Sequence, residues 1–245
     1  MAPHPTAFLT RALRVARTEI AAVAALLVAT LGVLVFVELA DGVHDAENQV
    51  FDRAVLAAVR PYADDPGRPW GPWWLHEGAA DLTSLGGLSV LALFAIMAVG
   101  FLLIMRKRLS ALMLTVGLAG GVALSQGLKI LFDRPRPPDI YQAVETMNAS
   151  FPSGHTLLST VFYLTLGVML TRAFPRRGLK AYILCCAVVI ALLIGVTRIY
   201  LAAHWASDVF AGWSVGAAWS MVLWLAAYAL ERRQRLHDAP FQDAP

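Results

Sequence analysis

The sequence has few charged residues and almost no cysteine. Only 15% of its 245 residues are charged, and the only cysteines, Cys185 and Cys186, are adjacent inside an apolar run. We interpret them as packing residues, because nothing in their surroundings resembles a disulfide framework or a Cys/His metal cluster. The net charge is only +3, so the positions of the charged residues are more informative than their sum. We expect no nucleic-acid partner.

Apolar residues, in contrast, make up 58% of the chain and occur in long runs. A helix of about 20 such residues crosses the hydrocarbon core of a bilayer. The sequence therefore predicts an all-α fold, a bundle of six transmembrane helices. The expected spans are Glu19–Ala40, Leu85–Met105, Ser110–Phe132, His155–Phe174, Ala181–Val196 and Trp205–Leu230.

These spans predict one membrane domain over residues 19–230, between a basic N-terminus at 1–18 and a tail at 231–245 that we expect to be disordered. A signal peptide is the alternative for the first run, but the run is long and lacks a convincing cleavage site. Most basic residues fall in segments that six spans place on one side of the membrane. The positive-inside rule then predicts that both termini are cytoplasmic. The bacterial inner membrane is a separate inference, from the compact chain without organelle signals.

Residues 41–84 are expected to form an extracytoplasmic segment along the membrane surface. One side of a helix here would be apolar and would carry Phe51, Val55, Leu56 and Val59, whereas Asp52, Arg53 and Arg60 fall elsewhere. Three tryptophans, Trp70, Trp73 and Trp74, follow among prolines and a glycine. We favour an aromatic belt for them over a lipid entrance.

Four basic residues violate the charge rule together, because Lys129, Arg134, Arg136 and Arg198 cluster at the outer ends of the third and fifth spans. A lone lysine at such a boundary usually extends toward the headgroups, and arginines in a proline-rich loop are usually solvated. Their common location nevertheless favours a bound anion, because Lys and Arg form charge-assisted hydrogen bonds with phosphate.

Two further blocks lie at the same predicted membrane face. In Pro152-Ser153-Gly154-His155, the serine is a candidate helix cap and the glycine allows close backbone approach. His204 and Asp208 are one helical turn apart, so the carboxylate can fix the imidazole tautomer and leave one nitrogen as a nucleophile. Such a pair is often structural, but three blocks on one face are difficult to explain by chance.

Together, these blocks resemble the type 2 phosphatidic acid phosphatase (PAP2) superfamily, whose signature is K-x6-R-P, P-S-G-H and S-R-x5-H-x3-D. The matching residues are Lys129 to Arg136-Pro137, Pro152 to His155, and Arg198 with His204 and Asp208. One difference is Thr197, which stands where the family has serine and which keeps a hydroxyl. The match covers roughly residues 84–230 in order and spacing.

The resemblance implies that His204 attacks phosphorus and forms a phosphohistidine, with Asp208 orienting it. His155 would protonate the leaving oxygen and then activate water. The groups that would hold the phosphoryl oxygens are Lys129, Arg136, Arg198, the Ser153 hydroxyl, and the backbone amides of Ser153 and Gly154. No metal or cofactor is implied. Arg134 lies outside the signature, and we interpret it as a loop charge that touches a headgroup.

The resulting functional prediction is a periplasmic lipid phosphatase acting on undecaprenyl pyrophosphate, phosphatidylglycerol phosphate or phosphatidic acid. A phosphotransferase that uses a lipid acceptor in place of water remains open. A transporter of anions is disfavoured, because it needs basic residues throughout the membrane depth. A non-catalytic lipid-binding protein is disfavoured because His155, His204 and Asp208 are all present. The oligomeric state is not predicted.

Overall fold

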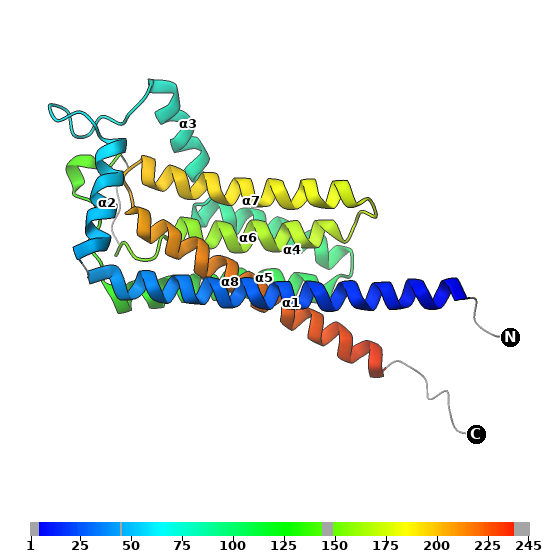
Figure 1. The fold of residues 1–245 in the computed structure, drawn as a ribbon. Coiled ribbons are helices and arrows are strands. Elements are labelled where there is room, and N and C mark those ends of the chain that lie inside the picture. Colours follow the sequence, from blue (N-terminus) through cyan, green and yellow to red (C-terminus); the bar gives the residue numbers. More distant parts are fainter. Residues whose placement is uncertain (1–4, 45, 144–148, 238–245) are drawn as a thin grey trace.

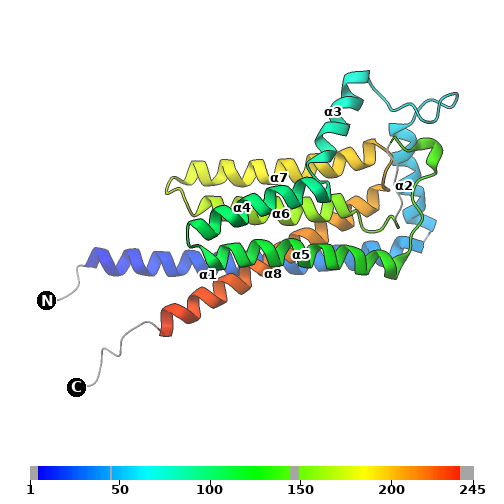
Figure 2. The same cartoon turned by 180° about the vertical axis from the view of Figure 1, so that it is seen from behind.

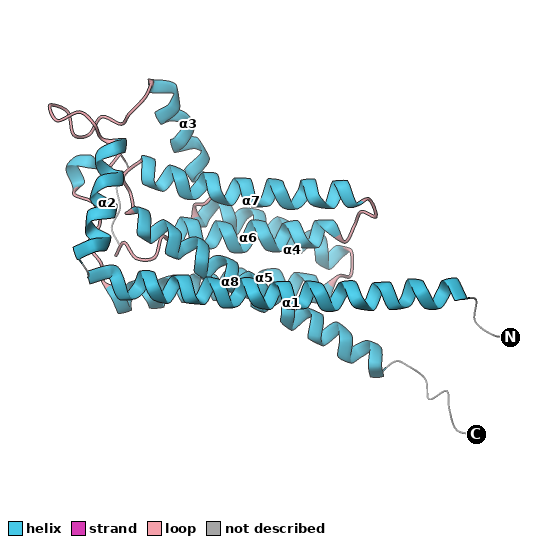
Figure 3. Ribbon diagram, in the orientation of Figure 1, coloured by secondary structure: helices cyan, strands magenta, loops and turns pink. Residues whose placement is uncertain are grey.

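The structure is a computed structural model that describes residues 5–44, 46–143 and 149–237. These residues form helices joined by loops (Figure 3). In chain order the elements are α1 (Pro5–Asp41), η1 (Gly42–His44), α2 (Ala46–Val59), α3 (Trp73–Ser84), α4 (Leu88–Ile104), α5 (Arg108–Phe132), η2 (Asp139–Tyr141), α6 (Gly154–Thr171), α7 (Arg177–Tyr200) and α8 (Ala206–His237). The predicted all-α class is confirmed.

Within the described residues, five helices are long and apolar enough to cross a membrane, and α3 with α4 form a sixth candidate that is bent by 48°. The protein is thus a multi-pass membrane protein with the predicted bundle. Two boundaries differ from the sequence prediction. The candidate second span, the bent pair of α3 and α4, includes residues that we had assigned to the surface segment, and α8 continues to His237 through the start of the expected disordered tail. Residues 1–4 and 238–245 of the predicted terminal segments lie outside the described residues.

Helix α6 is the centre of the bundle and packs against α4, α5, α7 and α8. Every residue from Thr156 to Phe162 is buried, so this helix has protein on all sides. The buried hydroxyls of Ser159 and Thr160 both donate to the Thr156 carbonyl of the same helix, Thr160 Oγ1 over 2.7 Å. Because α6 faces protein rather than lipid, it tolerates more polar residues than a lipid-facing helix.

Helix α8 approaches α6 closely through the small residues that the sequence spaces at four-residue steps. A Cβ atom on Gly212 would lie 2.9 Å from the Ser153 carbonyl oxygen, and one on Gly216 would lie 2.8 Å from Thr160 Cβ. Both distances are shorter than van der Waals contact, so only glycine fits without a shift of the helices. This contact brings the start of α8 against the loop that enters α6.

Replacing Gly216 with alanine is expected to destabilise the protein by about 1–3 kcal/mol, because the methyl group overpacks the α6–α8 contact. Gly100 of α4 is a matched control, since nothing lies within 4 Å of a Cβ atom built there. Gly100→Ala should leave the stability unchanged or slightly higher. Denaturant unfolding of both variants in detergent measures the difference, and equal stability would contradict the packing argument.

Helix α2 lies across the end of the bundle that is opposite the two termini (Figures 1 and 2). The sequence prediction described its apolar side but not its contacts with protein. Phe51, on the predicted apolar side, is 47% exposed, whereas Asp52 is 2% exposed. Arg60, just after α2, is also buried, and it donates to the carbonyls of Tyr141 and Tyr200 over 3.0 and 2.8 Å. The helix therefore docks on protein through polar groups.

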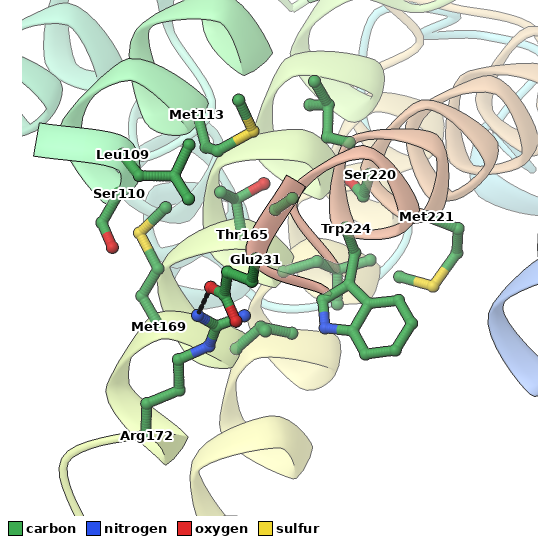
Figure 4. A pocket seen from close by; sticks show the side chains of 14 residues that line it. Leu109, Ser110, Met113, Thr165, Met169, Arg172, Ser220, Met221, Trp224 and Glu231 are labelled. Atoms are coloured by element: carbon green, nitrogen blue, oxygen red, sulfur yellow. Dashed lines mark hydrogen bonds and ion pairs between the residues drawn. The ribbon is translucent and has the colours of Figure 1, made fainter. Parts of the chain in front are cut away.

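At the opposite end of the bundle, an apolar groove of about 50 Å³ lies between α5, α6 and α8. Figure 4 shows Met113, Met169 and Trp224 along it and the Arg172–Glu231 ion pair at its edge. None of the predicted site residues lines this groove. The predicted site residues lie instead at the end that α2 covers.

Candidate active site

The three sequence blocks meet at one end of the bundle. Lys129 lies in the last turn of α5, His155 in the first turn of α6, and Arg198 in the last turn of α7. His204 follows in the α7–α8 connector, and Asp208 lies in the first turn of α8. Because neighbouring helices run in opposite directions, their ends converge on the same face. Arg198, His204, Arg136 and Lys129 all lie close enough to the His155 imidazole to interact with it electrostatically.

Asp208 is fully buried beside the His204 ring. Its Oδ2 lies 3.5 Å from His204 Nδ1, which is long for a hydrogen bond. Ser150 bridges this separation, because its hydroxyl donates to Asp208 Oδ2 and lies 3.3 Å from His204 Nδ1. The backbone amide of Trp205 also donates to Oδ2 over 2.9 Å. The expected His–Asp pair is thus present, with a serine that the motifs did not indicate.

Packing beneath the site fixes this serine. Phe151, which follows Ser150, is fully buried and stacks against Phe36 of α1 and the edge of Phe132 of α5, with centroids 5.7 and 4.9 Å apart. The Ser150 amide in turn donates to the Arg134 carbonyl over 2.8 Å. The packing of Phe151 and the hydrogen bond of the Ser150 amide therefore hold the loop before α6 where it carries the Ser150 hydroxyl.

The other nitrogen of His204, Nε2, lies 3.2 Å from a guanidinium nitrogen of Arg136. A guanidinium only donates hydrogen bonds, so Nε2 must present its lone pair and the proton must lie on Nδ1, toward Asp208. Burial lowers the pKa of His204 to about 3, and Asp208 offsets this effect only partly. The imidazole is therefore neutral at pH 7, with Nε2 available as a nucleophile.

Lys129 and Arg198 are two further buried cations at this end of the bundle. Lys129 is 7% exposed, and its ammonium donates to the Ala149 carbonyl over 2.6 Å. Arg198 is 5% exposed and donates to Thr83 Oγ1 of α3 over 3.0 Å. Within the described residues, Arg198 Nε is buried and has no hydrogen-bond partner. This donor is therefore available to an acceptor that the chain does not supply.

The Pro-Ser-Gly-His block matches the expectation only in part. Ser153 occupies the N-cap position of α6, but its side chain makes no capping bond and its Oγ accepts from Thr156 over 2.9 Å. Its backbone amide, which we expected to hold a phosphoryl oxygen, donates to the Asp208 carbonyl over 3.0 Å. Gly154 fits the expected close approach, because a Cβ atom there would lie 3.1 Å from Ser125 Oγ and 3.8 Å from Lys129 Cε.

His155 lies against the bend between α3 and α4. A Cβ atom on Gly87 would lie 3.8 Å from His155 Nε2, and one on Gly86 would lie 3.2 Å from the His155 carbonyl oxygen. These two glycines interrupt the second span and leave room for the imidazole. Sequence reasoning missed this role, although an adjacent glycine pair at the start of an apolar run was the available signal.

Arg134 differs most from its prediction as a loop charge that touches a headgroup. It is 5% exposed and forms ion pairs with Asp208 and with Asp52 of α2, at 2.5 and 2.7 Å. Among the residues that the structure describes, no group of three or more His, Cys, Asp or Glu side chains could hold a metal ion. The cationic side chains described at the site are those of Lys and Arg.

The fold and the site together describe one kind of integral membrane protein. It is a multi-pass helical bundle that carries a buried histidine–aspartate pair and a cluster of cations at one end. The PAP2 superfamily model matches residues 110–232. Phosphatidylglycerophosphatase B of Bacillus subtilis is 30% identical over 187 residues, which cover 75% of this chain and 86% of that protein. The chain belongs to the PAP2 superfamily, as the sequence motifs predicted.

Other relatives agree. The crystal structure of a transmembrane PAP2-type phosphatidylglycerolphosphate phosphatase from Bacillus subtilis matches with a TM-score of 0.72 and 25% identity, over 87% of this chain and 98% of that one. Aquifex aeolicus LpxE shares the fold, with a TM-score of 0.53 and 24% identity over 70% and 93% of the two chains. Lipid A 1-phosphatase of Rhizobium johnstonii is 37% identical over 73 residues, 30% of this chain and 26% of that protein.

Proposed function

We propose that this protein hydrolyses a lipid-borne phosphate or diphosphate without a metal ion, through a phosphohistidine on His204. The substrate candidates are phosphatidylglycerol phosphate, undecaprenyl pyrophosphate and phosphatidic acid. The similarity to enzymes named for lipid phosphates supports this substrate class. We further propose that the site faces the periplasm of a bacterial inner membrane and that both termini are cytoplasmic, because the basic residues predict that topology.

One observation carries the proposal. Neither Lys129 nor Arg198 forms an ion pair with a carboxylate of the described residues, although both are buried. Asp208, the carboxylate of the site, is already paired with Arg134. Buried cations without a counterion are costly, so a bound anion must complete this arrangement. A phosphoryl group meets the requirement, because its three oxygens accept several charge-assisted hydrogen bonds.

The proposed reaction has two steps. His204 Nε2 attacks phosphorus, the bond from phosphorus to the lipid oxygen breaks, and His155 gives that oxygen a proton. His155 then takes a proton from a water molecule, which attacks phosphorus and releases phosphate from His204. Lys129, Arg136 and Arg198 stabilise the charge on the phosphoryl oxygens in both steps, with the Ser153 hydroxyl as a further donor. Asp208 stabilises the imidazolium character that develops on His204.

The purified full-length protein is expected to release phosphate from at least one lipid of a panel of these three substrates in excess EDTA. Release should exceed that from a soluble sugar phosphate at least about tenfold, because the site lies where a membrane-anchored headgroup is concentrated. Activity that is lost in EDTA and restored by Mg²⁺ would contradict the metal-independent mechanism. Label that moves from the substrate to another lipid, without free phosphate, would identify a phosphotransferase.

The same assay on sealed membrane vesicles without detergent tests the sidedness. Phosphate is expected outside right-side-out vesicles, where an impermeant phosphate sensor detects it, and inside inverted vesicles. The opposite pattern would place the site at the cytoplasmic face.

A further inference from the structure

Arg134 joins the catalytic helix end to a helix that the family motifs do not include. One guanidinium nitrogen, Nη1, donates to Asp208 Oδ1 over 2.5 Å and to Ser207 Oγ over 2.8 Å. The other, Nη2, donates to Asp52 Oδ2 over 2.7 Å. All of these groups are buried, so little solvent weakens the ion pairs. The guanidinium is therefore fixed between two carboxylates.

Asp52 holds more than Arg134. Its Oδ1 accepts from the Ser207 backbone amide over 2.9 Å, and its Oδ2 accepts from the Ser207 hydroxyl over 2.6 Å. That amide lies in the first turn of α8, where backbone N–H groups have no partner within the helix. Asp52 thus supplies, from α2, the capping carboxylate that the residues just before α8 would ordinarily provide.

These contacts determine how Asp208 faces the nucleophile. Because Arg134 occupies Oδ1, the other oxygen, Oδ2, is directed to Ser150 and His204 Nδ1. The Arg134 carbonyl also accepts from the Ser150 amide over 2.8 Å. Both groups that face His204 Nδ1 are therefore held by Arg134, one through its side chain and the other through its backbone.

We propose that Asp52 and Arg134 are positioning residues, which hold Asp208 so that His204 keeps its proton on Nδ1 and its lone pair on Nε2. Neither residue contacts the phosphoryl-binding cations Lys129 and Arg198 through a hydrogen bond or ion pair that the structure describes. The role of these residues in turnover rests on the proposed phosphatase function. It follows that α2 must be docked on α8 for the site to be competent.

The test compares Asp52→Asn, Arg134→Gln, Arg134→Lys and the Asp52→Asn/Arg134→Gln double variant in the purified full-length protein. Arg134→Gln should lower kcat about 100-fold and Asp52→Asn about tenfold, with KM changed less than about threefold. The double variant should lose much less than the product of the two single losses, since Asp52 and Arg134 position the same carboxylate, that of Asp208. Arg134→Lys should recover part of the loss, because an ammonium keeps the charge but not the two-sided geometry.

Arg53→Gln is the matched control. It removes a neighbouring charge from the exposed side of α2, where Arg53 donates to Gln49 of the same helix at 3.3 Å. Its kcat should equal that of the wild type. In Asp52→Asn or Arg134→Gln, a rise in KM at constant kcat would overturn the inference in favour of a substrate-binding role. Losses that multiply in the double variant would overturn it in favour of two independent effects.

A second measurement does not depend on activity. In protein with ¹⁵N-labelled histidine, the His204 resonances, assigned with His204→Gln, should report Nδ1 protonated in the wild type and a mixture of tautomers in Arg134→Gln. An unchanged tautomer in a folded Arg134→Gln protein would overturn the inference. If the wild type hydrolyses none of the lipid phosphates, the proposed function fails, and these spectra still decide whether Arg134 positions His204.

Discussion

Replacing His204 with alanine is expected to lower phosphate release about 10⁴-fold. The loss is large because the variant lacks the imidazole nitrogen that accepts the phosphoryl group in the proposed reaction, and what remains is binding by the cations. His204→Gln should be equally inactive, since an amide nitrogen has no lone pair for attack. Phosphate release by purified protein in detergent measures the effect.

His76→Ala provides the matched control, because this histidine of α3 lies about two helical turns before Thr83 and outside the cation cluster. It should keep activity within about twofold. Melting temperatures should separate loss of chemistry from loss of fold, and His204→Ala should melt near the wild type. Substantial activity in a folded His204→Ala protein would exclude this residue as the nucleophile.

The sequence predicts the site well where a residue's neighbours are fixed by helix ends. Lys129, His155, Arg198 and Asp208 each lie at the boundary of an apolar run, and antiparallel helices must bring such boundaries together. The order and spacing of the motifs were therefore sufficient to place these four residues at the same end of the bundle. The same reasoning does not find Ser150 or Thr83, because each contributes one hydroxyl whose partner is distant in sequence.

The role of α2 was not predicted, for a different physical reason. The sequence indicates an apolar side that includes Phe51 and places Asp52 elsewhere on the helix, without naming a partner for it. In the structure α2 covers a protein surface that already contains Arg134 and the unsatisfied amides at the start of α8, and a carboxylate is the best partner for both. Helical periodicity cannot identify this partner, because it does not say what the helix packs against.

Replacing His155 with alanine is expected to lower the steady-state turnover of a lipid phosphate about 10²–10⁴-fold, because both steps lose their proton transfer. Attack by His204 and hydrolysis of the phosphohistidine can be observed separately with a substrate whose leaving group needs no proton. With ³²P-labelled p-nitrophenyl phosphate, attack by His204 should continue while water is no longer activated. His155→Ala should therefore give a burst of p-nitrophenol and retain acid-labile label on the protein.

The double variant His155→Ala/His204→Ala is the control, and it should show neither burst nor label. Label that persists in the double variant would place the phosphoryl group on another residue. A His155→Ala protein that turns over p-nitrophenyl phosphate at the wild-type rate would show that His155 does not activate water. The assignment of the two histidines to different steps depends on this asymmetry, because His204 Nε2 faces Arg136 while His155 lies against the glycines of the α3–α4 bend.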